Sequence, residues 1–384
     1  LDDLIRQRKK ENLLLQQGPM DYIPYYKNPC WYSKMPSEAT GSNPYEYNPY
    51  NQDPTANLQK ARRIMSKKRE QGHLVKTRCL PLIYLIGVTA AGSNDIYDDI
   101  IMHSDIAKPA MKEPMWWNRY TIGWFTLSVI GRNKRAVTFS DYLDLFDSAA
   151  DAIEEIASPS SEHLLLTVEG SSTYLWNYDG WEEISGNRGL SEPKYILAHA
   201  IRELVPKAKI VVILRHPTER LFLHFKKILP TASSQEFHER VIQAVETFNQ
   251  CLQNHTLRHC AYKGSDWYER VSLFLRASLY SVYLEDWLKV FPREQLLVLR
   301  TEDYYHNRRA TLEQVFSFVK LGFLSETVWD KILTSTVENS EEAYDGTRDG
   351  EMYNATRMIL NNFFRPYNNH LAHLLNDQKY LWNS

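Results

Sequence analysis

The sequence lacks any run of about 18 consecutive apolar residues, so we expect no segment of it to span a bilayer. It also lacks an excess of one charge, because 45 Lys and Arg against 47 Asp and Glu give a formal net charge of −2. The molecule as a whole therefore has no attraction for nucleic acid, and a polyanionic partner would need a local basic patch. The first residue is Leu and no signal-type apolar region follows it, so we expect a targeting or anchoring segment upstream.

Cysteine is scarce, and its spacing excludes the common metal sites. The four cysteines, at positions 30, 79, 251 and 260, form neither a CxxC pair nor a zinc-ligand spacing, so we predict no metal. Cys251 and Cys260 enclose an acceptor for N-linked glycan that begins at Asn254, and Asn354 begins a second acceptor. An acceptor inside a potential disulfide loop favours a Cys251–Cys260 disulfide and a secretory compartment. Two buried, reduced cysteines are the alternative.

What the chain does contain is an alternation of short apolar segments and helical patterns from about residue 80 to the end. Its 384 residues are 43% hydrophobic, enough for a large core. The predicted strands are 82–87, 163–168, 209–214 and 295–299. The predicted helices are 94–103, 141–157, 191–204, 218–228, 235–252, 276–291, 310–318 and 352–376. This order predicts an α/β fold with a parallel β-sheet flanked by helices and function at the carboxyl ends of its strands.

The residues before this domain have a different character. We predict a charged helix over 1–20, which suits a stem or a coiled-coil fragment. Residues 22–55 are rich in Pro, Tyr and Asn and are expected to form an extended segment lying on the domain. The basic stretch 59–71 is expected to form a solvated helix.

The first predicted strand runs directly into a loop bounded by Gly87 and Gly92 and then into a helix. Backbone N–H groups of such a loop converge on one point and favour a phosphate there, although an ordinary tight turn is the alternative. The Lys-Ser/Thr pair of a nucleoside-triphosphate P-loop is missing after Gly92. No convincing Mg²⁺ carboxylate follows a strand either, and both absences argue against a kinase or other nucleoside triphosphatase.

Two other strands end in polar segments. Strand 209–214 leads into Arg215-His216-Pro217-Thr218-Glu219-Arg220, where two guanidiniums flank a helix start. They suit a phosphate, or an internal Arg–Glu pair. Strand 163–168 leads into Glu169-Gly170-Ser171-Ser172-Thr173-Tyr174, whose hydroxyls could donate to a ligand or cap a helix.

Between these segments, Lys112 and Glu113 precede the pair Trp116 and Trp117. A carboxylate base, a cation and flat apolar faces suit a sugar hydroxyl as acceptor. Paired tryptophans are more often part of a core.

Taken in order, these segments resemble the Golgi carbohydrate sulfotransferases over about residues 25–384. The similar segments are the strand and Gly loop, Lys112 to Trp117, Glu169 to Thr173, Leu214 to Arg220, Ser278 to Tyr280, Leu284 to Leu288, Phe291 to Leu299, Phe363 to Asn368 and the end of the chain through Trp382. The segments around Cys30 and Cys79 are similar to the branch that 6-O-sulfates N-acetylgalactosamine 4-sulfate in chondroitin. The resemblance implies a P-loop-like sulfotransferase fold over residues 80–384, with residues 1–79 as a stem and an N-terminal segment packed on it.

The resemblance also implies an activity and a set of site residues. The activity is transfer of a sulfuryl group from 3′-phosphoadenosine 5′-phosphosulfate (PAPS, leaving the product PAP) to a glycosaminoglycan hydroxyl, without a metal. Glu113 would take the proton from that hydroxyl, with Lys112 beside it. The implied nucleotide-binding residues are Gly87, Val88, Thr89, Ala90, Ala91, Gly92, Ser93, Asn94, Arg215 and Arg220. The implied acceptor-binding residues are Trp116, Trp117, Arg119, Ser172 and Thr173.

Further implications concern the protein's surroundings. The resemblance implies a second disulfide, Cys30–Cys79, and a sulfated glycosaminoglycan as partner. It also implies a Golgi-lumen location as the soluble part of a type II membrane protein, or secretion, and a possible homodimer. Contact with a membrane would be made only through a segment outside this sequence.

The chain departs from the family pattern inside the donor site. Ala90 stands where the family's loop lysine neutralises the leaving group, and residues 93–94 are Ser-Asn where the family has Thr-Thr. Leu223 replaces a serine that shares the 3′-phosphate, and Met115 replaces a frequent histidine. Two hypotheses follow: an active sulfotransferase with a rewired donor site, in which Lys112 replaces the missing ammonium, or a silent relative that binds sulfated glycan or a partner enzyme.

Overall fold

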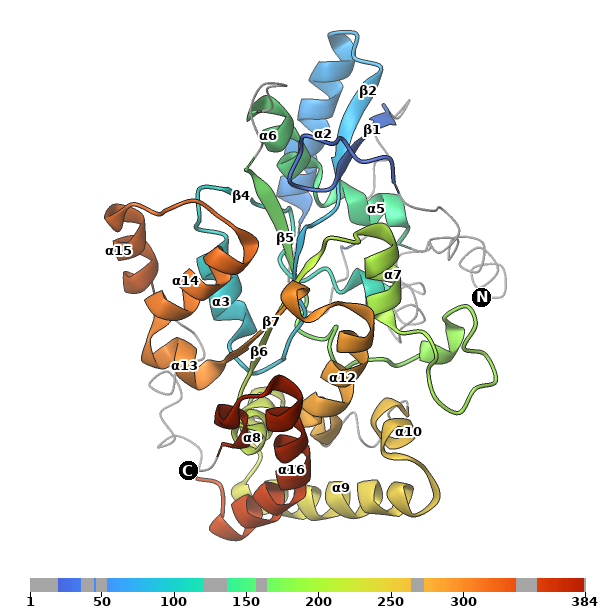
Figure 1. Ribbon diagram of the computed structural model, residues 1–384, viewed down its shortest axis with the longest axis vertical. Helices are drawn as coiled ribbons and strands as arrows, with labels where there is room; N and C mark the ends of the chain where they lie inside the picture. Colours follow the sequence, from blue (N-terminus) through green and yellow to red (C-terminus); the bar gives the residue numbers. More distant parts are fainter. Residues whose placement is uncertain are drawn as a thin grey trace.

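The protein is built around one central parallel sheet. The computed structural model describes residues 20–35, 45, 54–120, 137–156, 164–263, 273–335 and 351–382. The five strands run in the order β4 (Ile106–Ala107), β5 (Leu166–Gly170), β3 (Ile83–Leu85), β6 (Lys209–Leu214) and β7 (Leu296–Arg300), as Figure 1 shows. In register, Ile83 of β3 lies between Val168 of β5 and Lys209 of β6. The predicted parallel α/β fold is confirmed.

The predicted strands lie within three residues of the observed ones, and strand 209–214 has the predicted bounds. Within β6, Ile210–Leu214 form an apolar run that is fully buried, as expected for a central strand covered on both faces. The sequence did not predict β4, because two residues are too short to show a period. Helix 1–20 lies outside the described residues except for its last residue.

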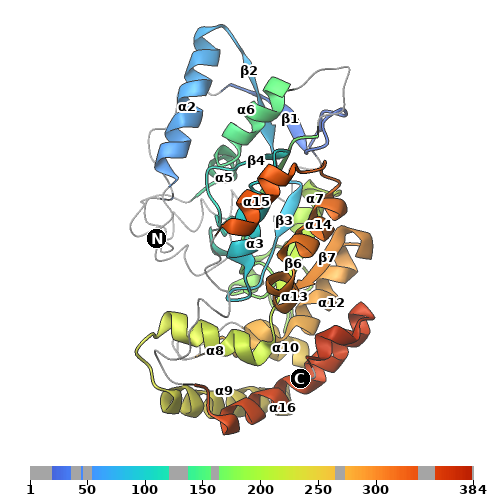
Figure 2. The ribbon, with the colours of Figure 1, turned by 90° about the vertical axis from the view of Figure 1, so that its left-hand side faces the viewer.

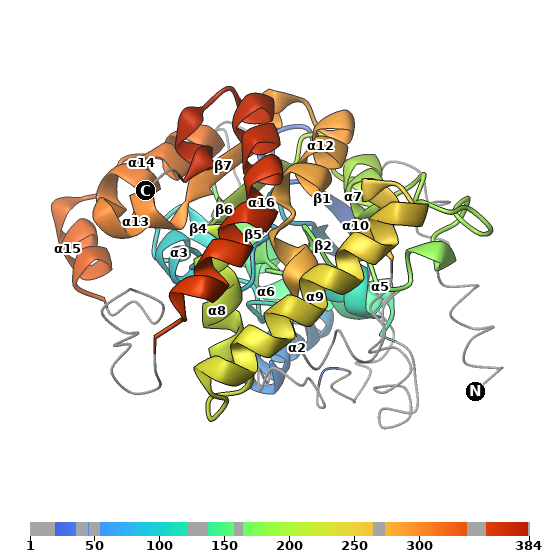
Figure 3. The ribbon, with the colours of Figure 1, turned by 90° about the horizontal axis from the view of Figure 1, so that it is seen from below.

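Helices cover both faces of the sheet and close its carboxyl edge. On one face lie α3 (Ser93–Ile100), α13 (Thr301–His306), α14 (Arg308–Val319) and α15 (Glu326–Thr334). On the other lie α7 (Leu197–Leu204) and α12 (Tyr280–Val290) (Figure 1). Figures 2 and 3 show a further layer made of α8 (Pro217–Ile228), α9 (Ser234–Asn254) and α16 (Asn354–Leu375), with α10 (Leu257–Tyr262) following α9.

Several predicted helices have different ends. The predicted helix 141–157 is two helices, α5 (Phe139–Asp144) and α6 (Asp147–Ile156), and a 3₁₀ turn at Leu275–Ser278 replaces the start of the predicted 276–291 helix. The predicted 191–204 helix begins only at Leu197. Helices α10, α13 and α15 were missed, since each is short. Pro217 occupies the first position of α8, as expected from its fixed φ.

The N-terminal segment contains a two-stranded antiparallel sheet, which was not predicted, and a helix where the sequence predicted one over 59–71. Residues 36–44 and 46–53, within the stretch expected to be extended, lie outside the described residues. Strands β1 (Cys30–Lys34) and β2 (Val75–Cys79) pair with Cys30 opposite Cys79, and these two cysteines form a disulfide. Helix α2 (Thr55–Glu70) packs with β2 against α6 (Figure 2). The side chain of Asn28 ties this part to the main sheet, since it donates to the Leu80 carbonyl at 2.9 Å and accepts the Thr167 N–H at 3.0 Å.

Ion pairs of two buried cations hold β2 on the end of α5 and the start of α6. Lys76 lies 2.7 Å from Asp147, and Arg78 lies 2.6 Å from Asp144 and 3.0 Å from Asp147. Among the helices that the structure describes, none is both long and apolar enough to cross a membrane.

Candidate active site at the carboxyl ends of the strands

The loop between β3 and α3 has the backbone form of an anion site. Ala90 and Gly92 both lie in the left-handed region, with φ of 64° and 77°. Gly92 precedes α3 and has no side chain to accept the first N–H groups of the helix. The Thr301 hydroxyl lies 2.7 Å from the Ala91 carbonyl and 3.0 Å from the Leu214 carbonyl, so it joins this loop to the end of β6. The N–H groups that start α3 therefore suit a phosphate or sulfate oxygen.

Two glycines permit a close approach around this loop. A Cβ on Gly87 would lie 3.2 Å from the Ser172 carbonyl oxygen. A Cβ on Gly170, at the end of β5, would lie only 2.4 Å from the Tyr97 ring of α3. The small residue at 170 thus lets α3 lie directly against β5.

Glu113 lies beside the loop, as the sequence suggested. Its Oε1 accepts the Ser172 backbone N–H at 3.0 Å, and the Ser172 Oγ lies 3.2 Å from the Thr89 Oγ1. Glu113 and Ser172 are both buried. The Glu113 carboxylate is therefore connected through Ser172 to Thr89 of the loop. It can accept a proton from a group bound beside it.

Lys112 reaches the first turn of α3. Its Nζ lies 3.1 Å from the Asn94 carbonyl oxygen and 2.6 Å from the Asp98 carboxylate, and 5.4 Å from the centre of the Tyr97 ring. This ammonium is thus placed at the helix that follows the loop, and the Asn94 carbonyl that it contacts lies three to four residues after Ala90 and Ala91 in the chain.

Arg215 follows β6 on the other side of the loop. The Tyr280 hydroxyl donates to its carbonyl at 2.9 Å, and the next residue, His216, donates its N–H to Glu302 at 2.7 Å. Burial and a hydrogen bond to Asp95 raise the pKa of the Tyr305 phenol, and the Arg215 charge opposes the shift. A Cβ on Gly92 would lie 3.0 Å from the Tyr305 hydroxyl, so Arg215, Tyr305 and the loop are neighbours.

Comparison with known proteins assigns this arrangement to a family. Residues 182–358 match the family model described as a sulfotransferase domain. The whole chain is 33% identical to human (Homo sapiens) carbohydrate sulfotransferase 15 over 401 residues and 32% identical to the mouse (Mus musculus) protein over 394 residues, covering 69% of each. This chain belongs to the carbohydrate sulfotransferases. The resemblance seen in the sequence is confirmed. A crystal structure of a sulfotransferase from Alicyclobacillus acidocaldarius aligns with 78% of this chain and 96% of its own, at 19% identity and a TM-score of 0.48.

Some predicted site residues of this sulfotransferase are buried in its interior. Trp116 and Trp117 pack against the Tyr142 and Phe139 rings, so their faces are not open to a sugar. They are core residues, the alternative that sequence reasoning had left open, and the prediction that they contact the acceptor has no support in the structure.

The same holds for three polar side chains. Arg220 is fully buried and donates from Nε to Ser278 and from Nη2 to the Phe274 carbonyl, so in this structure it holds the 3₁₀ turn and offers no surface to a nucleotide. Thr173 is buried, and its hydroxyl and carbonyl accept from Asn118. Arg119 is also buried. Glu219, the acid of the internal Arg–Glu pair that stood as the alternative for 215–220, pairs with Arg357 of α16.

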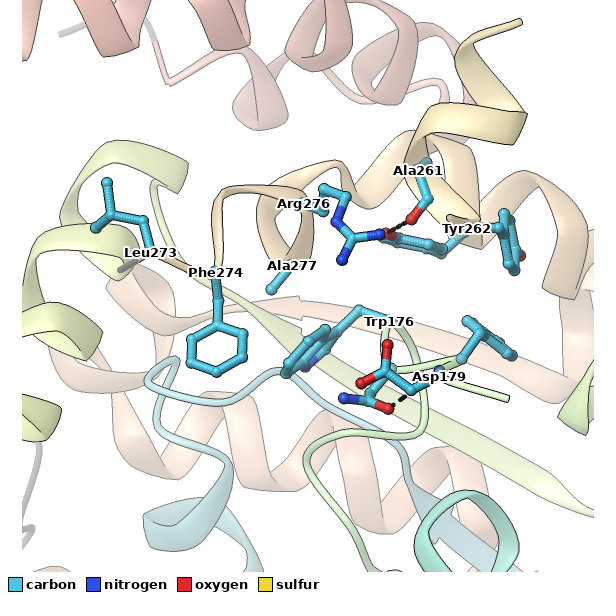
Figure 4. Close-up of a pocket in the computed structure, with 11 residues that line it drawn as sticks. Trp176, Asp179, Ala261, Tyr262, Leu273, Phe274, Arg276 and Ala277 are labelled. Carbon is cyan, nitrogen blue, oxygen red and sulfur yellow. Dashed lines mark hydrogen bonds between the residues drawn. The ribbon is translucent and has the colours of Figure 1, made fainter. Parts of the chain in front are cut away.

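Sequence reasoning missed a small pocket beyond the hydroxyl-rich segment. Figure 4 shows Trp176 beside Phe274, with ring centroids 5.4 Å apart, and Arg276 and Asp179 near them. Flat rings beside polar side chains are what sugar rings contact in proteins. The only signal in the sequence was a Trp four residues after Ser172.

The cysteine and glycan predictions concern residues away from this site. Cys251 and Cys260 form a disulfide between α9 and α10. Asn254 and Asn354 are both exposed, which leaves both acceptors accessible on the surface. Among the residues that the structure describes, no three His, Cys, Asp or Glu side chains form a group able to hold a metal ion.

Proposed function

We propose that this sulfotransferase moves a sulfuryl group from PAPS to a sugar hydroxyl of chondroitin or dermatan sulfate, specifically the 6-OH of N-acetylgalactosamine 4-sulfate. The observation that carries the proposal is the Glu113 carboxylate, held 3.0 Å from the Ser172 N–H and linked through Ser172 to Thr89 of the loop. The acceptor position is supported by the segments around Cys30 and Cys79 and by the identity with the carbohydrate sulfotransferase 15 proteins.

The residues around the loop fit a nucleotide of this kind. The donor supplies the sulfuryl group, and negative charge grows on its leaving phosphate as the sulfur–oxygen bond breaks. The N–H groups that start α3 stabilise that charge, and they do so more strongly in the transition state than in the ground state. Within 87–94, the Val88 and Ala91 N–H groups are already donated to the Ile213 and Val88 carbonyls. In this proposal Arg215 holds the second phosphate of the same nucleotide, and its position after β6 beside the loop supports that role.

Glu113 acts on the acceptor. As the sugar oxygen forms its bond to sulfur, its proton passes to the Glu113 carboxylate, which contributes about 10²–10⁴-fold to the rate. The contact with Ser172 holds the carboxylate in position for that transfer.

Lys112 supplies the positive charge that the family's loop lysine provides and that Ala90 cannot. Its Nζ already lies at the first turn of α3, so a change of side-chain rotamer away from Asp98 redirects the charge toward the bound anion. The substitution Lys112→Met is expected to weaken PAP binding and lower kcat, whereas Lys60→Met, on the exposed face of α2, changes neither. Wild-type values in Lys112→Met would remove this lysine from the mechanism.

Disulfides and glycan acceptors support the proposed compartment. Two disulfides and two exposed glycan acceptors suit an oxidising secretory compartment, in keeping with the Golgi lumen or secretion. Glycosidase treatment that shifts the mass of the secreted protein, and no shift in Asn254→Gln with Asn354→Gln, would test the acceptors.

The activity is tested by transfer of labelled sulfate from PAPS to chondroitin, chondroitin 4-sulfate and dermatan sulfate, followed by disaccharide analysis. We expect product from the 4-sulfated acceptors, with the label on the 6-position of the amino sugar. Glu113→Gln is expected to abolish most of this sulfate transfer. The matched control is Glu155→Gln, which removes an exposed acid on α6. Transfer to another position would overturn the acceptor assignment, and PAP binding without transfer to any acceptor would overturn the proposed activity.

A further inference from the structure

Glu169 is a buried acid beside the site that the proposed reaction does not use directly. It lies one residue before the end of β5 and is 1% exposed. Its Oε1 accepts the Ser171 hydroxyl at 2.9 Å and the Tyr174 hydroxyl, and its Oε2 accepts the Tyr142 hydroxyl. Three hydroxyl donors on one carboxylate make this the centre of a polar network inside the core.

Each of the three hydroxyls also accepts an N–H from the segment 115–117. The Ser171 Oγ accepts the Met115 N–H at 3.1 Å, the Tyr174 hydroxyl accepts the Trp117 N–H at 3.3 Å, and the Tyr142 hydroxyl accepts the Trp117 indole N–H at 3.1 Å. An ionised carboxylate can only accept. All three hydroxyl protons therefore point toward the carboxylate, and the hydroxyl oxygens remain free to accept the N–H groups of residues 115–117.

The segment needs these anchors. Met115 has a φ of 48°, in the left-handed region that an L side chain rarely adopts, so its conformation persists only if the surroundings hold it. Glu113 lies two residues before Met115, and the Ser172 N–H that binds Glu113 follows Ser171 directly. Glu169 is thus connected to both partners of the Glu113–Ser172 hydrogen bond, to Glu113 through the 115–117 segment and to Ser172 through Ser171.

We infer that Glu169 is a positioning residue, which through Ser171, Tyr174 and Tyr142 holds the 115–117 segment and thereby sets Glu113 in place for proton transfer. The inference rests on the proposed function in so far as Glu113 is the base. It also gives the paired tryptophans a role, since Trp117 supplies two of the three N–H groups that attach the segment.

The network has a built-in dependence on pH. Burial raises the pKa of Glu169 to about 7, and its hydrogen bonds to the three hydroxyls and to the Trp117 side chain oppose the shift. The titratable groups facing it are phenols with raised pKa values, Tyr84 from β3, Tyr97 from α3, Tyr142 from α5 and Tyr174, with Glu113 beyond Tyr97. Protonated Glu169 must donate its own O–H, so one hydroxyl has to turn away and an N–H of the segment loses its acceptor. The segment is therefore held most firmly above pH 7.

The test follows the Met115 and Trp117 amides by hydrogen–deuterium exchange, corrected for the intrinsic effect of pH. In the wild-type protein we expect their protection to fall about tenfold between pH 8 and pH 6, the effect of one lost hydrogen bond. In Glu169→Gln we expect that low protection at both pH values. Tyr174→Phe, which keeps the carboxylate, should expose the Trp117 amide but not the Met115 amide. Asp286→Asn, which removes another buried acid, bound to Arg258 at 2.8 Å, should alter neither.

Kinetics supply the second readout. Glu169→Gln is expected to lower kcat about tenfold or more while the KM for PAPS stays within twofold, because the 87–94 loop is untouched. The variant should also lose the fall in kcat below pH 7. Full protection of both amides in Glu169→Gln at pH 8, or a wild-type kcat, would overturn the inference. A wild-type protein that is inactive on every acceptor would overturn the proposed function, while the exchange data would still decide whether Glu169 holds the segment.

Discussion

The contact between α3 and β5 gives a sharp prediction, because it links packing to the donor site. In Gly170→Ala the new methyl would lie 2.4 Å from Tyr97 Cδ2 and 3.2 Å from Tyr97 Cγ. Carbon atoms pack at about 3.5–4.0 Å, so ring and strand must separate by about 1 Å. Tyr97 is buried and its Cγ is at the base of the ring, so the ring alone cannot swing clear and α3 must move. Overpacking of this kind costs about 1–3 kcal/mol of unfolding free energy.

The displacement also reaches the loop, since α3 begins at Ser93 and its first N–H groups are the proposed anion donors. We expect Gly170→Ala to bind PAP about tenfold more weakly by calorimetry, which corresponds to about 1.4 kcal/mol. Gly72→Ala is the matched control: Gly72 has a φ of 86° and nothing within 4 Å of an added Cβ. It should lose about 1–2 kcal/mol of stability from backbone strain and none of the affinity. Wild-type stability and affinity in Gly170→Ala would refute the reasoning.

Three further predictions concern charged groups. Glu113→Gln should lower kcat by about 10²–10⁴-fold with unchanged PAP affinity by calorimetry, and an unchanged kcat would show that it is not the base. Because the pKa of Glu169 rises from 4.5 to about 7 on folding, its contribution to stability is complete below pH 4.5 and is lost as the pH rises to 7. Urea unfolding should show this loss, about 3 kcal/mol, in the wild type but not in Glu169→Gln, and parallel curves would contradict it. Arg78→Met leaves Asp144 without its guanidinium and should cost about 3–5 kcal/mol by thermal unfolding, with PAP binding intact; a loss under 1 kcal/mol would show that the pair adds little.

The sheet was predictable where burial leaves a local pattern. The run Ile210–Leu214 is apolar because both faces of β6 are covered, and that is visible in five letters of sequence. The Gly-bounded loop after β3 and the acid at 113 were predictable from residue type and order alone. Strand β2 was not, because Lys76 and Arg78 are charged and no local pattern shows that they are buried.

Around Glu113, too, some features were predictable from local sequence and others were not. The sequence left both a sugar platform and the more frequent core position open for Trp116 and Trp117, and their packing on Tyr142 decides for the core. Glu169 stood in the sequence merely as a polar residue at a strand end. Its three hydroxyl donors come from positions 142, 171 and 174, and the first of these belongs to another element.

By itself, then, the amino-acid sequence determined the α/β alternation, the Gly-bounded loop, the candidate base and the family. These depend on neighbours along the chain: apolar runs, glycines that allow left-handed backbone, and motif order. Only the tertiary structure decided the strand order, the burial of charge in β2 and the network around Glu169. Whether a polar side chain can be buried depends on partners far away in the chain, such as Asp147 of α6, about 70 residues after Lys76 and Arg78, and no local pattern contains that information.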